Sequence, residues 1–106
     1  MPNNYKNAKV DLTATSATVL YTCPEDTTAL VKSILASEDS GNADTLTVTI
    51  TSGSSVFSLF KVKAIGANTT VELLTEPLVV QENEILKVTA ATADRLHVVA
   101  SLLEIS

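Results

Sequence analysis

The most constraining feature of this chain is a strict alternation of threonine with larger apolar residues near its middle. In the segment 45–51, which reads TLTVTIT, Leu46, Val48 and Ile50 fall on one side of an extended chain and the threonines on the other. β-Branched residues sit well on a pleated surface and crowd a helix. The segment therefore predicts a strand with one buried side and one solvent-facing side.

The strand pattern extends over most of the chain, and no window of comparable length combines helical spacing of apolar residues with capping signals at both ends. Nine strands are predicted, at residues 8–13, 18–23, 28–38, 45–51, 55–65, 69–74, 78–80, 84–92 and 96–105. Short runs rich in Pro, Gly, Asn, Asp and Ser separate them, as turns require. This spacing predicts an all-β fold, a single small jelly-roll-like β-sandwich of about eight or nine short antiparallel strands.

Nothing in the sequence marks a domain boundary. The length of 106 residues suits one domain, and the chain has no linker, low-complexity tail or block of like charges. We therefore predict one β-sandwich domain over residues 1–106, with residues 1–7 as an N-terminal arm.

The composition argues against several classes of function. The net charge is −5 and the seven basic residues are scattered, so we expect no nucleic-acid binding. Aromatic residues make up 4% of the chain and Trp is absent, which disfavours a stacking platform for sugars or bases. No apolar stretch could span a membrane, and the start of the chain lacks a secretion signal, so we expect synthesis in a cytoplasm and no membrane contact.

The strand predicted at 96–105 carries apolar residues on both sides. Its even-numbered positions from Leu96 to Leu102 are apolar, and Val99, Leu103 and Ile105 lie on the opposite side. Such a strand is either central in its domain or covered by another subunit.

The strand predicted at 55–65 shows the same property. Val56, Phe60 and Val62 lie on one side, while the other side mixes apolar residues with two lysines. Two such strands in one small domain indicate oligomerisation. The candidate residues of a subunit interface are Phe57, Leu59, Ile65, Leu103 and Ile105.

The chain offers few residues for catalysis. Cys23 and His97 are the only cysteine and histidine, so an internal disulfide and a multi-cysteine metal site are excluded. A catalytic role for either would need a partner group brought close by the fold. A packed thiol and a histidine at a surface or subunit contact are the simpler interpretations. We predict no enzyme activity, no catalytic residue and no cofactor.

Two further segments carry ligand-like residues. The loop Glu38–Asp44 gathers oxygen-bearing side chains, but the order that a calcium-binding EF-hand requires is absent. A solvated hairpin turn is preferred and no metal is expected. Residues 68–70, which read NTT, match a glycosylation acceptor but are interpreted as a turn. Four carboxylates could converge in the fold, although a solvated acidic rim is simpler; they are Glu72, Glu76, Glu82 and Glu84.

The order of several strand and turn phrases is similar to that of a known group of proteins. The phrases are VDLT at 10–13, LYTCP at 20–24, TALVKSI at 28–34, ANTTVELL at 67–74, EPLVV at 76–80 and EILKVTA at 84–90. From about Lys6 to Ile105 the chain resembles the small β-sandwich virion proteins of tailed bacteriophages, particularly of marine and cyanobacterial hosts. Those proteins often read Gly-Asp where this chain has Asn83-Glu84, and Asn tolerates a positive φ nearly as well as Gly.

The resemblance implies a structural component of a phage particle, located in the virion after synthesis in the host bacterial cytoplasm. We expect a capsid decoration, or cement, protein that binds and stabilises the assembled shell. Its partners would be the major capsid protein or tail proteins, and other copies in a homo-oligomer expected to be a trimer.

Two alternative functions stay open at this point. One is a tail, neck or fibre component. The other is a receptor- or glycan-binding module, which would need a concave site with exposed aromatic side chains. The available aromatic residues are Tyr5, Tyr21, Phe57 and Phe60.

Overall fold

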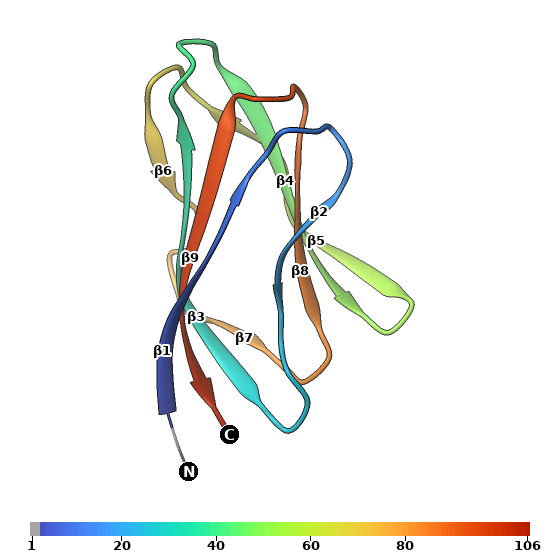
Figure 1. The fold of residues 1–106 in the computed structure, drawn as a ribbon. Coiled ribbons are helices and arrows are strands. Elements are labelled where there is room, and N and C mark those ends of the chain that lie inside the picture. The colour runs from blue at the N-terminus through green and yellow to red at the C-terminus, as the bar shows by residue number, and fades with distance from the viewer. Residues whose placement is uncertain (1–2) are drawn as a thin grey trace.

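The computed structural model describes residues 3–106 as two antiparallel sheets packed against each other (Figure 1). These residues form nine strands: β1 (Asn3–Asp11), β2 (Thr18–Thr22), β3 (Thr28–Glu38), β4 (Asp44–Ser52), β5 (Ser55–Ile65), β6 (Thr70–Glu72), β7 (Leu78–Val80), β8 (Ile85–Ala90) and β9 (Leu96–Ile105). The five-stranded sheet has the order β1-β9-β3-β6, with β7 also pairing with β3, and the four-stranded sheet has the order β2-β8-β4-β5. Residues 3–106 contain no helix long and apolar enough to cross a membrane.

The connectivity is that of a jelly roll. β6 and β7 pair with successive parts of β3, so they act as two halves of one interrupted strand. Counted in this way, the first strand pairs with the last, the second with the last but one, and so on to the β4–β5 hairpin. A long hairpin folded over into two sheets has this pairing. The predicted all-β, jelly-roll-like sandwich is confirmed.

The core is the layer of aliphatic side chains between the sheets. Along β9, Leu96, Val98, Ala100 and Leu102 are buried, and the residues between them are at least partly exposed. β9 lies between β1 and β3, so it is a central strand of the sheet. Its outward side chains therefore lie on the outside of the sandwich. The threonine strand β4 also follows its prediction at its start, because Leu46 and Val48 are fully buried.

A bulge at Lys32 reverses which residues of β3 face the core. Before the bulge the odd-numbered residues are buried, and after it the even-numbered residues are. As a result, Leu30 and Leu35, although five positions apart, both point to the outer side of the five-stranded sheet.

The strand bounds agree with the prediction for residues 28–38, 55–65, 78–80 and 96–105 and differ elsewhere at the ends. The largest difference is at β1, which begins at Asn3 rather than Ala8 because its residues pair in register with β9. Residues 3–7 of the predicted arm thus belong to the sheet, and residues 1–2 lie outside the described residues. Asn83 has a φ of 64°, which fits the turn expected there.

β5 does not follow the regular alternation that was predicted for it. Two register shifts against β4 interrupt the strand, and Val62 has a φ of 54° with its N–H donating to Thr47 Oγ1 at 3.1 Å. Leu59 and Phe60, neighbours in sequence, both pack against the core, while Phe57 is exposed. The prediction of two regular apolar sides is therefore wrong for this strand, because bulges change the direction of successive side chains.

Leu102 and Leu103 provide a direct test of which side of β9 supports the fold. Leu102 is 2% exposed in the core, whereas Leu103 is half-buried on the outer side. Leu102→Ala should lower the free energy of unfolding by about 2–5 kcal/mol, and Leu103→Ala by less than about 1 kcal/mol. Urea denaturation followed by circular dichroism measures both. Equal losses would show that both leucines support the same core.

Candidate interaction surfaces

The outward residues of the five-stranded sheet form what we call the outer face. The pairing register sets them in rows that run across the strands, since paired residues of neighbouring strands point to the same side. In the order β1, β9, β3 and then β6 or β7, the rows are Asn3–Ile105–Thr28, Tyr5–Leu103–Leu30–Val79, Asn7–Ser101–Ser33, Lys9–Val99–Leu35–Glu72 and Asp11–His97–Ser37–Thr70. We name each four-residue row by its β1 residue.

The outer face is apolar along the whole Tyr5 row and in the middle of the Lys9 row. In the Tyr5 row, the end residues Tyr5 and Val79 are 76% and 52% exposed. In the Lys9 row, Leu35 is 37% exposed and lies beside the half-buried Val99. The Lys32 ammonium lies 5.7 Å from the centre of the Tyr5 ring, in cation–π contact. Regular apolar rows on the solvent side of a sheet are typical of a surface that binds another protein.

A second exposed apolar group lies on the four-stranded sheet. Val56, Phe57 and Val62 of β5 are 62%, 55% and 59% exposed, and we call them the hairpin patch. Val56 pairs with Thr51 and Phe57 with Ile50, so these two side chains point to opposite sides of the hairpin. Figure 1 shows the β4–β5 hairpin projecting from the body of the sandwich. β5 is an edge strand, and its bulges and two lysines, Lys61 and Lys63, protect it from uncontrolled pairing with other strands.

The predicted interface residues are divided among different places. Leu103 and Ile105 lie on the outer face, whereas Phe57 belongs to the hairpin patch. Leu59 is half-buried against the core, and Ile65 is fully buried in it. A residue inside the domain's own core is not available to a neighbour, so the structure removes Ile65 from the candidate interface.

Sequence reasoning missed the part of the outer face that β3 and β7 contribute. Leu30, Leu35 and Val79 complete the apolar rows that Leu103 and Val99 begin. The available signal was the run TALVKSILAS at residues 28–37. Apolar residues precede and follow its single lysine, and they are too many to lie on one side of a strand.

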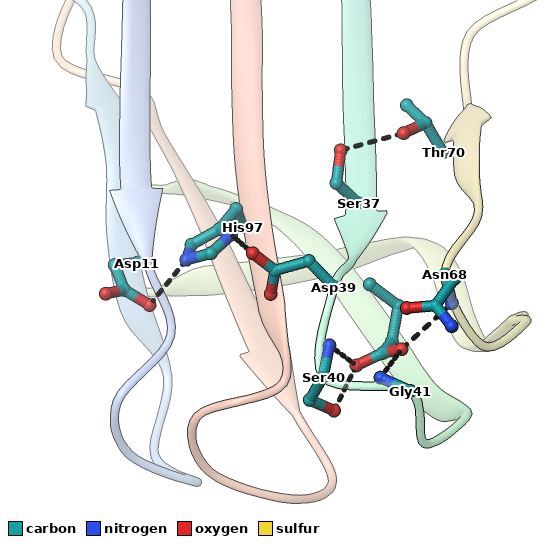
Figure 2. A network of polar contacts seen from close by, with 9 residues as sticks. Asp11, Ser37, Asp39, Ser40, Gly41, Asn68, Thr70 and His97 are labelled. Atoms are coloured by element: carbon teal, nitrogen blue, oxygen red, sulfur yellow. Dashed lines mark hydrogen bonds and ion pairs between the residues drawn. The ribbon is translucent and has the colours of Figure 1, made fainter.

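His97 lies at one end of the outer face, between two carboxylates (Figure 2). Its Nε2 is 3.2 Å from Asp11 Oδ1 and its Nδ1 is 3.6 Å from Asp39 Oδ2. The neighbouring Ser37 Oγ contacts Thr70 Oγ1, at 3.0 Å, and not the His97 ring. Both His97 nitrogens are directed at carboxylates, so Ser37 and His97 do not form the nucleophile–base hydrogen bond that serine catalysis uses.

The Glu38 side chain organises two loops at the same end of the sandwich. Its carboxylate accepts hydrogen bonds from the Ser40 hydroxyl, from Ser40 N–H at 2.7 Å, and from Gly41 and Asn68 N–H at 3.0 Å each (Figure 2). Burial alone would raise the pKa of this carboxyl, but these hydrogen bonds outweigh it and lower the pKa to about 2.

The loop Glu38–Asp44 connects β3 in one sheet to β4 in the other, so it is not the hairpin turn that was predicted. The Glu38 carboxylate is occupied by loop N–H groups, and Asp44 Oδ2 accepts a hydrogen bond from Thr92 N–H at 3.1 Å. Within the described residues, no group of three or more His, Cys, Asp or Glu is arranged to hold a metal ion.

Of the other four predicted acidic residues, Glu72, Glu82 and Glu84 also accept hydrogen bonds from backbone N–H groups, and the four do not converge on one place. Glu72 accepts hydrogen bonds from the Ser33 hydroxyl and from Ile34 and Leu74 N–H, beside the bulge in β3. Burial alone would raise its pKa, and these hydrogen bonds lower it overall. Glu82 and Glu84 cap turns near an open depression of about 500 Å³ at the other end of the sandwich.

Tyr21 and Glu104 form a buried polar link between the sheets. The Tyr21 hydroxyl donates to Glu104 at 2.5 Å, and Lys6 Nζ lies 3.2 Å from the same carboxylate. Burial, reinforced by the bond to Glu104, raises the pKa of Tyr21 well above its usual value. Burial likewise raises the pKa of the nearby Cys23 thiol, which donates to Thr27 O at 3.3 Å. A protonated, packed thiol is a poor nucleophile.

Removing the Glu38 charge tests its role in joining the loops. Because folding lowers this pKa, the carboxylate stabilises the fold fully above about pH 4.5, and the contribution is lost as pH falls toward about 2. Glu38→Gln should lower the melting temperature at pH 7 and flatten its decline between pH 4.5 and 2.5. The exposed Glu76→Gln is the control. Melting curves that shift in parallel at every pH would contradict this role.

No protein-family model matches the sequence, and neither a curated protein nor a solved structure matches it.

Proposed function

We propose that this chain is a structural protein of a tailed phage particle, a capsid decoration protein that binds and stabilises the assembled shell. One observation carries the proposal: the domain presents exposed apolar residues in two separate places, the outer face of the five-stranded sheet and the β4–β5 hairpin of the other sheet. A protein that bridges neighbours needs two such surfaces, whereas an enzyme needs one site where reactive groups converge.

The fold and the resemblance of the sequence support the same proposal. Jelly rolls are common in viral capsid proteins, although they also occur in lectins and cupins, so the fold alone does not specify a function. The proposed mechanism uses binding energy alone. A protein that binds only the assembled shell shifts the equilibrium toward that shell.

The polar groups of the chain fit this proposal better than a catalytic one. The carboxylates of Glu38, Glu72 and Glu104 hold loops, a bulge and the two sheets together. They are therefore already used in maintaining the fold. The net charge of −5 also suits a protein made in many soluble copies.

A glycan-binding function receives less support from the surface. The two strongly exposed aromatic residues, Tyr5 and Phe57, lie on different sheets, so they cannot form one stacking platform. The Tyr5 ring is also engaged by Lys32.

Binding to phage heads that lack the chain tests the proposal. The purified chain should sediment with such heads and raise their temperature of disruption. Phe57→Ser should weaken this binding about tenfold or more, because it removes an exposed aromatic anchor. Val19→Ser is the matched control, since Val19 is 50% exposed on β2 of the same sheet but outside the hairpin patch.

A density map of the complete phage particle is a second test of the proposal. Copies of the domain on the shell support the proposal. Copies confined to the tail, neck or fibres would replace decoration with that role, and particles without the chain would reject a virion function.

A further inference from the structure

Charge is distributed unevenly across the outer face. In the Lys9 row, Lys9 stands at the β1 edge and Glu72 at the β6 edge, with Val99 and Leu35 between them. The Lys32 side chain reaches from β3 to the Tyr5 ring and so adds its ammonium near the β1 edge. The lowered pKa of Glu72 keeps the opposite edge negative. Along the Lys9 row the face therefore runs from positive at the β1 edge to negative at the β6 edge, with apolar residues between them. The acidic residue of the β1 edge, Asp11, lies one row away beside His97.

We propose that the outer face binds the same face of a second copy of this chain, about a twofold axis parallel to the strands and between β9 and β3. Such an axis keeps each row at its own height and exchanges its ends. It places Lys9 of one copy opposite Glu72 of the other, twice in each dimer. This opposition of charges is the reason for choosing a second copy as the occupant.

The remaining rows are compatible with the same operation. In the Tyr5 row the end residues Tyr5 and Val79 meet, and Leu103 meets Leu30, so apolar side chains cover apolar side chains. In the Asp11 row, Asp11 meets Thr70, and His97 meets Ser37, as follows from their order across the sheet. Two sheets with nearly parallel strands are a common packing arrangement.

The area of the outer face sets the expected affinity of the dimer. Five rows and four strands cover roughly 27 Å by 19 Å, or about 500 Å² in projection, against about 800 Å² per partner in a typical stable interface. The axis also brings both Asp39 carboxylates, each beside its own His97, to the same end of the contact. We therefore expect a reversible dimer with a Kd of about 1–100 μM.

The inference deepens the proposed function and rests on it only for its biological setting. A twofold axis closes the assembly at two chains, so a dimer takes the place of the trimer expected from the sequence. With the outer face covered, the hairpin patch is left free to contact the shell.

Sedimentation velocity over a range of concentrations tests the dimer. The wild-type chain should dimerise, and Leu103→Asp should weaken association about a hundredfold or more by placing an unpaired charge in the contact. Val62→Asp on the opposite sheet should leave the dimer intact. Lys9→Glu should weaken it several-fold, and Lys61→Glu, the same charge change on β5, should not. Circular dichroism checks that each variant is folded, and Val79→Asp replaces Leu103→Asp if that variant unfolds.

Cross-linking tests the direction of the axis. A short bismaleimide should join Asp11→Cys to Thr70→Cys in a mixture of the two variants and join neither variant to itself. Three results would overturn the proposal. The first is a chain that stays monomeric at about 1 mM. The second is a Val79→Asp or Leu103→Asp variant that is folded and still dimeric, and the third is self-linking of one cysteine variant. A monomer that still binds phage heads overturns the dimer alone, whereas a dimer that binds no heads overturns only the phage function.

Discussion

The structure depends on one layer of aliphatic side chains packed between two sheets. The chain has a single cysteine, so no internal disulfide reinforces that layer, and aromatic residues add little to it beyond Tyr21 and the half-buried Phe60. Each strand must therefore send alternate residues into it. Where continued alternation would turn a core residue outward, a bulge restores the order. The bulge at Lys32 in β3 returns Ile34 to the core, and a second bulge lies between Val19 and Tyr21 in β2. In β2 the bulge lets the adjacent Leu20 and Tyr21 both enter the core.

Carboxylates complete the backbone pairing where the ladders stop. Glu38 binds N–H groups of two loops, and Glu72 binds N–H groups beside the bulge where β6 has ended and β7 has not begun. Glu104 joins β9 to Tyr21 of the opposite sheet. Buried or strained backbone donors need such partners. The acidic residues that looked available for a metal or for catalysis are thus largely required by the fold.

The jelly roll leaves each sheet with one side in the core and one side toward solvent. The outer face carries leucines and valines on its solvent side, and the β4–β5 hairpin of the other sheet carries further exposed apolar residues. Small apolar surfaces of this kind give weak individual contacts. Weak contacts act together when many copies are held side by side, which the proposed binding to an assembled shell would require.

The sequence by itself determined the all-β class, all nine strands and the burial of Leu46 and Val48, because alternation at period two is a local property. It showed that β9 is apolar on both sides, and the structure decided that Leu103 and Ile105 lie on the outer side. Only the tertiary structure decided the rest. The bulges that turn Leu30 and Leu35 to one face, and that break the sides of β5, depend on pairing with distant strands. The burial of Ile65, the partners of Glu38 and the rows of the outer face depend on register between segments far apart in the chain, which no local pattern encodes.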